Sequence, residues 1–139
     1  MLNKASYWLT LTGGFGMLKT VAMVFGVFFL VIGVLGFVPA ATPGDMLFGV
    51  FHVNFVHNVV HLVTGVVALY CGSEGDELSK MFFRVFGVVY AVVAVLGFVY
   101  GTGDIFGVMA NNMADNWLHV VVAAVSVYFG FFYCHKCVT

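Results

Sequence analysis

Charged side chains are scarce in this sequence. Lys, Arg, Asp and Glu together make up 8% of the 139 residues, against about 25% in an ordinary soluble domain. The net charge is −1 and there is no run of basic residues, which argues against nucleic acid as a partner. Three cysteines are too few for a disulfide scaffold. The sequence also lacks a phosphate-binding loop and a nucleophile motif, which favours a non-catalytic role and leaves open an enzyme whose partner subunit completes the site.

Apolar residues predominate instead, since 63% of the chain is hydrophobic and the mean hydropathy is +1.09. Four stretches contain no charged residue, at 21–38, 55–70, 85–100 and 117–133. Each reaches the length of a membrane-spanning helix once its flanks are added. No strand-like alternation occurs, so helices must satisfy the backbone in hydrocarbon. The sequence therefore predicts an all-α bundle of four transmembrane helices, with the lipid bilayer as its first partner.

The basic residues all fall on one side of the membrane if the four spans alternate in direction. They are Lys4, Lys19, Lys80, Arg84 and Lys136. The opposite loops, at 39–45 and 101–104, contain neither Lys nor Arg. By the positive-inside rule, both termini are predicted to be cytoplasmic.

The two halves of the chain resemble each other. Residues 25–38 align without gaps with residues 86–99, and small residues recur on one face of both runs, as expected of helix-packing positions. Each half holds two spans, which predicts two tandem hairpins with a pseudo-two-fold axis along the membrane normal. The predicted boundaries are an interfacial segment at 1–20, a first hairpin at 21–71, a cytoplasmic connector at 72–84, a second hairpin at 85–134 and a cytoplasmic tail at 135–139.

A polar stripe follows one face of the second span and again of the fourth. Its members in the second span are Asn54, His57, Asn58 and His61, and those in the fourth are Asn112, Asp115, Asn116 and His119. Steps of three and four residues keep each set on one helical face. Ionisable groups within a membrane mark a functional site by default. The two copies differ only where His57 is replaced by Asp115, so we expect any chemical site at this break in the symmetry.

Two cofactor hypotheses follow from the stripe. In the first, His57, His61, Asp115 and His119 bind a divalent metal such as zinc, iron or copper, and the four asparagines orient the imidazole rings. In the second, His61 and His119 alone are the axial ligands of haem b, which suits electron transfer.

Other hypotheses need no cofactor. The stripe could be a hydrogen-bonded seam that holds the helices together, in a structural subunit that forms a homo-oligomer or joins a larger membrane complex. It could also relay protons or a small solute. A separate cytoplasmic metal or redox site is a further hypothesis, and its residues would be Cys71, Cys134, His135 and Cys137.

The motifs Asn58-x-x-His61 and Asp115-Asn116-x-x-His119 resemble a known group. It consists of small bacterial four-helix membrane proteins that share a domain of unknown function, with N-x-x-H in one apolar helix and D-N-x-x-H in a later one. The resemblance covers about residues 19–132. It implies a four-helix fold and a bacterial inner membrane, and it implies no activity.

Overall fold

Four long helices make up most of the chain, which a computed structural model describes from residue 16 to residue 133. They are α2 (Met17–Leu35), α3 (Phe55–Glu74), α4 (Asp76–Tyr100) and α5 (Met113–Val127), which a π-helical turn, η2 (Tyr128–Phe132), continues. By length and composition each could cross a membrane, α5 together with η2, which confirms the four predicted spans. Of the predicted interfacial segment, 1–20, only the last five residues are described.

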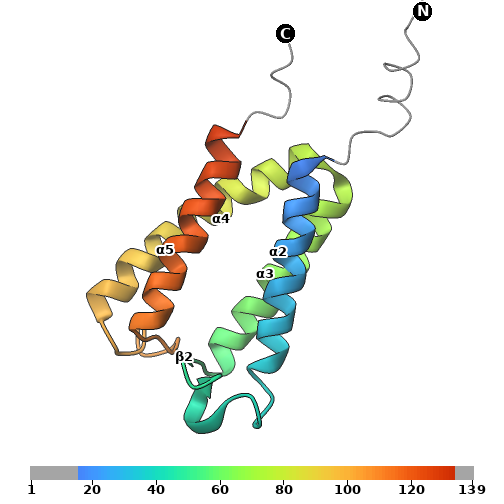
Figure 1. Cartoon of the computed structure of the whole chain (residues 1–139). Coiled ribbons are helices and arrows are strands. Elements are labelled where there is room, and N and C mark those ends of the chain that lie inside the picture. Colours follow the sequence, from blue (N-terminus) through green and yellow to red (C-terminus); the bar gives the residue numbers. More distant parts are fainter. Residues whose placement is uncertain (1–15, 134–139) are drawn as a thin grey trace, which may run out of the picture.

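The helices pack as two hairpins, α2 with α3 and α4 with α5 (Figure 1). Contacts between the hairpins are fewer and are made mainly by α4 with α2 and α3. Gly75 alone separates α3 from α4, at a φ of 120° that favours glycine. All residues of the predicted connector, 72–84, are therefore helical except Gly75. The acidic residues in the first turn of α4 suit a helix N-terminus. We call the end of the bundle that contains Gly75 the terminal end.

Glycines allow the helices of each hairpin to approach closely. A Cβ added to Gly26 would lie 2.9 Å from the carbonyl oxygen of Gly65, and one added to Gly87 would lie 2.9 Å from the backbone nitrogen of Val127. Neither position can accept a larger residue without moving the backbone of the neighbouring helix. The small residues thus form packing faces, as the sequence predicts.

Aromatic rings link the two hairpins near the middle of the bundle. The rings of Phe86 and Tyr90, on α4, are stacked with centroids 4.1 Å apart. Phe29, on α2, meets Phe86 edge to face at 5.6 Å. All three side chains are buried. Since these contacts are among the few that join α2 to α4, aromatic packing helps to set how the hairpins sit together.

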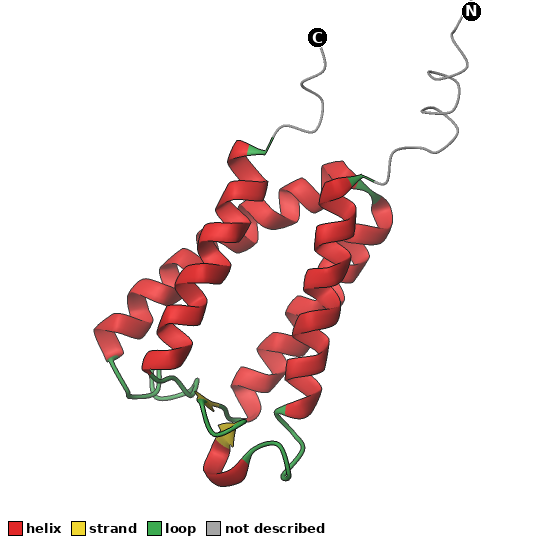
Figure 2. Ribbon diagram, in the orientation of Figure 1, coloured by secondary structure: helices red, strands yellow, loops and turns green. Residues whose placement is uncertain are grey.

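Two similar loops close the opposite end, which we call the loop end (residues 36–54 and 101–112). The first contains η1 (Pro43–Asp45) and an antiparallel pair, β1 (Met46–Leu47) and β2 (Phe51–His52), which lie between the hairpins in Figure 2. In each loop a Phe with positive φ, Phe48 or Phe106, precedes a glycine that also has positive φ. Four apolar loop side chains are buried: Leu47, Val53, Ile105 and Ala110. The loops therefore cover the interior at this end.

Candidate functional site

Asn54 and Asn112 begin α3 and α5 and also tie the two hairpins together. The side-chain oxygen of each accepts a hydrogen bond from an amide in the first turn of its own helix, at 2.9 and 3.0 Å. The Nδ2 of Asn54 donates to the carbonyl oxygen of Val108 at 2.8 Å, and that of Asn112 donates to the carbonyl oxygen of Val50 at 2.8 Å. Each asparagine thus caps one hairpin and holds the loop of the other.

Asp115 and His57 make a second pair of contacts between the hairpins. Oδ2 of Asp115 accepts from the backbone amide of His52 at 3.1 Å and from that of Asn112 at 2.9 Å. Nδ1 of His57 lies 2.9 Å from the carbonyl oxygen of Ala110. A carbonyl can only accept, so Nδ1 carries the proton and Nε2 keeps its lone pair. At the position where the two copies differ, Asp115 therefore accepts from a backbone amide and His57 donates to a backbone carbonyl of the other hairpin.

Asn58 and Asn116 bind the neighbouring helix within each hairpin. The Nδ2 of Asn58 donates to the carbonyl oxygen of Gly36 at 2.7 Å, and that of Asn116 donates to Gly97 at 3.0 Å. Asn111, which lies outside the predicted polar stripe, donates from Nδ2 to the carbonyl oxygen of Gly101 at 3.0 Å. The side-chain NH₂ groups of the four asparagines predicted to orient imidazoles instead bond to backbone carbonyls.

Three imidazoles remain beside this hydrogen-bonded framework. The ring of His57 is 4.5 Å from that of His61 and 6.2 Å from that of His119, centroid to centroid. All three side chains are more than nine-tenths buried. Nδ1 of His61 and Nδ1 of His119 are buried without a hydrogen-bond partner. A buried polar atom left unpaired is costly, so this cluster is suited to a bound molecule.

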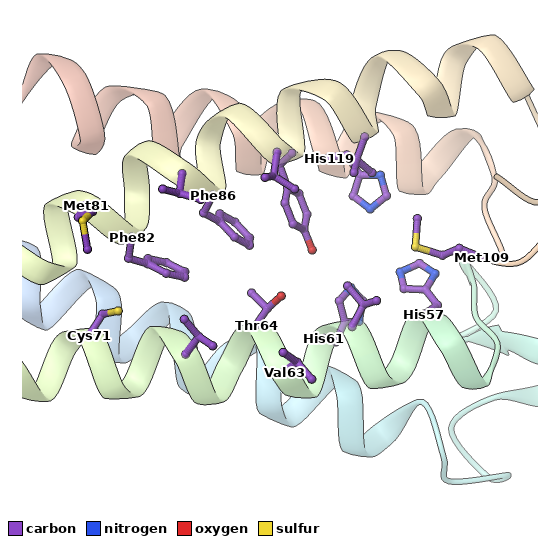
Figure 3. A pocket seen from close by; sticks show the side chains of 16 residues that line it. His57, His61, Val63, Thr64, Cys71, Met81, Phe82, Phe86, Met109 and His119 are labelled. Atoms are coloured by element: carbon purple, nitrogen blue, oxygen red, sulfur yellow. The ribbon is translucent and has the colours of Figure 1, made fainter. Parts of the chain in front are cut away.

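The cluster lies between two apolar cavities. Cavity A, of about 390 Å³, lies between α3 and α4, and cavity B, of about 310 Å³, is bordered by α2, α5 and the first loop. His57, His61, His119 and Tyr90 line both. Figure 3 shows His57 and His119 extending toward one another in cavity A, with Met109 beside them.

Tyr90 and Met109 are additions that the histidine pattern did not identify, whereas Thr64 follows His61 on the polar face of the second span. The hydroxyls of Tyr90 and Thr64 share a hydrogen bond inside the membrane-spanning region. The alignment of the repeats contains a signal for Tyr90, because the matching residue in the first copy is Phe29. Met109 comes from a loop, and no sequence pattern singles it out.

The structure gives no support to the four-ligand hypothesis for a bare metal ion. Among residues 16–133, no three or more His, Cys, Asp or Glu side chains are grouped so that they could hold one. Oδ2 of Asp115 accepts hydrogen bonds from two backbone amides, so this carboxylate has a structural role at the loop end. A haem requires only one or two axial imidazoles, so the lack of a larger group of ligands among these residues says nothing about haem binding.

The predicted cytoplasmic site falls mostly outside the described residues. Cys71 is a buried free thiol near the end of α3. Cys134, His135 and Cys137 lie beyond residue 133, the last residue described. This site stays a prediction from the sequence.

Comparisons with known proteins identify a family and supply no activity. Neither the curated proteins nor the solved structures include a significant match to this chain. A family match covers residues 19–132, nearly the same range as the resemblance seen in the sequence, and is described as a domain of unknown function, DUF4383. Since this match spans most of the 139 residues, the chain belongs to the DUF4383 family.

Proposed function

We propose that this membrane protein holds a haem between its two hairpins and serves in electron transfer. The observation that carries the proposal is the buried cluster of His57, His61 and His119, which borders two apolar cavities and has two ring nitrogens without partners. A haem is largely apolar and takes imidazole as an axial ligand. The site offers both features.

His57 and His119 are the ligand pair that the geometry favours. Their centroids are 6.2 Å apart, and two imidazoles on opposite sides of one metal ion, each at about 2.0 Å, would have centroids about 6 Å apart. His57 also has the hydrogen bond from Nδ1 to a backbone carbonyl that is usual for a ligating imidazole and leaves Nε2 for the metal. The sequence-based pair was His61 and His119, so this proposal replaces His61 with its neighbour on α3.

The walls of the site support a flat apolar cofactor. Phe29 and Tyr90 contact His61 and His119 edge to face, at 5.3 and 5.5 Å. Cavity B adds Phe28, Phe51 and Leu118. The protein would supply two ligands, aromatic surfaces and exclusion of water, while the iron would supply the one-electron chemistry.

A second function is favoured by a specific observation, the hydrogen bonds at the loop end. Asn54, Asn112 and Asp115 join the hairpins without any need for a cofactor. In this case the protein is a structural subunit that forms a homo-oligomer or joins a larger membrane complex. The polar stripe then serves only to hold the helices together. For either function we place the protein in a bacterial inner membrane with cytoplasmic termini, on the grounds of the family resemblance and the positive-inside rule.

Spectroscopy of the protein purified from membranes tests the haem proposal. We expect a Soret band corresponding to about one haem per chain, and loss of at least nine-tenths of it in His57→Gly and in His119→Gly. Imidazole added to His119→Gly should restore the band, because a free ligand can occupy the space of the missing ring. A role in folding alone would not show this rescue.

Two further variants serve as controls. His52→Ala should keep its haem, because His52 reaches Asp115 through its backbone amide. His61→Ala should also keep its haem if His57 is the ligand. Loss of haem in His61→Ala together with retention in His57→Gly would favour the pair His61 and His119. Wild-type protein without haem, from cells that make haem in excess, would overturn the proposal and leave the structural function.

A further inference from the structure

We propose that cavity A is a binding groove for an isoprenoid quinone, a flat ring with carbonyl oxygens and a hydrocarbon chain, which enters from the lipid between α3 and α4. This inference goes beyond the haem proposal and does not depend on it. It rests on the shape of the cavity, on its lipid-facing mouth and on the polar groups inside it.

The shape of cavity A suits a molecule with a chain. It is lined from His57 to Cys71 along α3, and at about 1.5 Å per residue those fourteen steps span roughly 21 Å. A volume of about 390 Å³ distributed over that length makes a narrow groove. The groove continues from the imidazole cluster toward the terminal end, so most of it lies beyond the proposed haem ligands.

The mouth of the groove faces the lipid. Six of its lining residues are apolar side chains between 38% and 62% exposed, three from α3 and three from α4: Val60, Val63, Val67, Met81, Val85 and Val89. The loop end is covered by buried loop residues such as Ile105 and Ala110. A molecule dissolved in hydrocarbon can therefore enter sideways between the two helices.

Hydrogen-bonding groups lie on the inner wall. Figure 3 shows His61 and Thr64 extending from α3 into the groove. The side chain of His61 is only 7% exposed, and its Nδ1 has no hydrogen-bond partner. The hydroxyl of Thr64 is hydrogen-bonded to that of Tyr90 across the groove. Imidazole and hydroxyl groups can donate to carbonyl oxygens. A pure hydrocarbon chain would leave the His61 nitrogen unpaired.

Aromatic rings favour a flat head group over the ester of an ordinary lipid. Phe82, Phe86 and Tyr90 form a continuous stack along α4, with successive centroids 5.1 and 4.1 Å apart and interplanar angles of 20° and 29°. All three line the groove. A quinone ring can stack against this surface while its oxygens reach the polar groups.

The test measures how much quinone remains with the protein. The wild-type chain is reconstituted in phosphatidylcholine vesicles that contain a fully substituted benzoquinone with two isoprene units, purified in mild detergent and extracted. We expect about one quinone per chain. Val67→Trp, which fills the mouth, should lower retention at least tenfold, whereas Val66→Trp should not, because Val66 faces lipid and lines neither cavity.

Polar variants test the recognition of the head group. Thr64→Val and Tyr90→Phe keep the shape of the groove and remove one hydroxyl each, so we expect binding to weaken about tenfold in each, equivalent to about 1.4 kcal/mol. Unchanged gel-filtration profiles and melting temperatures would show that these variants fold. Unchanged quinone retention in folded Thr64→Val, Tyr90→Phe and Val67→Trp would overturn the proposal.

The outcomes also separate this inference from the haem proposal. Wild-type protein prepared free of haem, from cells that cannot make haem, should still retain quinone. A straight-chain alcohol can be tested as a competitor for the bound quinone. If it displaces the quinone as well as unlabelled quinone does, the groove binds acyl chains only, and the assignment to quinone is overturned. Haem without quinone contradicts this inference alone, and quinone without haem contradicts the haem proposal alone.

Discussion

Replacing Gly97 with alanine is expected to destabilise the protein by about 2–4 kcal/mol, because the new methyl group would displace a buried amide. A Cβ at this position would collide with Oδ1 of Asn116. Asn116 is fully buried and its Nδ2 donates to the carbonyl oxygens of Gly97 and Gly101. Moving the side chain away from the new methyl group would strain both hydrogen bonds.

The measurement is unfolding in mixed micelles of increasing SDS content, followed by circular dichroism. Gly103→Ala is the matched control, since a Cβ there would make only an ordinary contact of 3.4 Å with the carbonyl oxygen of Tyr100. It should alter the unfolding free energy by less than about 0.5 kcal/mol. Equal stability of the two variants would show that Asn116 does not need its position between α4 and α5.

Replacing Asp115 with alanine is expected to cost about 2–4 kcal/mol and to loosen the contact between the hairpins at the loop end. The carboxylate is 2% exposed and completes the capping box of α5 with Asn112. Its second bond, from the amide of His52, comes from the other hairpin. Alanine leaves both amides without an acceptor and the first loop without one of its ties.

Hydrogen exchange read by mass spectrometry can locate this effect. Peptides that contain His52 and Asn112 should exchange much faster in Asp115→Ala, while the middle of α2 should not change. Asp115→Asn keeps an acceptor oxygen and should lose less stability than the alanine variant. Asp104→Ala, an exposed acid on the same loop end, should stay within about 0.5 kcal/mol of wild type. If Asp104→Ala proved as harmful as Asp115→Ala, general loss of negative charge would explain both.

The helices could be predicted from the sequence because lipid imposes a simple rule. Four uncharged apolar runs have few ways to satisfy their backbone in hydrocarbon, so hydropathy alone identifies them. The turn at Gly75 was harder to foresee, because polar residues such as Ser73 and Lys80 suggest a loop although they are helical. A helix that continues past the membrane surface looks like a connector when only hydropathy is considered.

The candidate site was predicted in its residues but not in their roles. Helical spacing placed His57, His61 and His119 in the interior, where the structure has them. It could not show that Asn54 donates to a carbonyl of the second loop, because that contact depends on how the two hairpins meet. The histidine at 57 and the aspartate at 115 looked like a mixed ligand pair, yet each bonds to the backbone of the opposite hairpin.

The apolar mouth of cavity A has a consequence for how affinity should be expressed. A ligand that arrives between Val67 and Val89 is drawn from the bilayer, where a compound of high partition coefficient is concentrated far above its level in water. Occupancy would then follow moles of ligand per mole of phospholipid, and adding empty vesicles would dilute the ligand at constant aqueous volume. A titration plotted against total molarity would therefore give a different apparent dissociation constant at every lipid concentration.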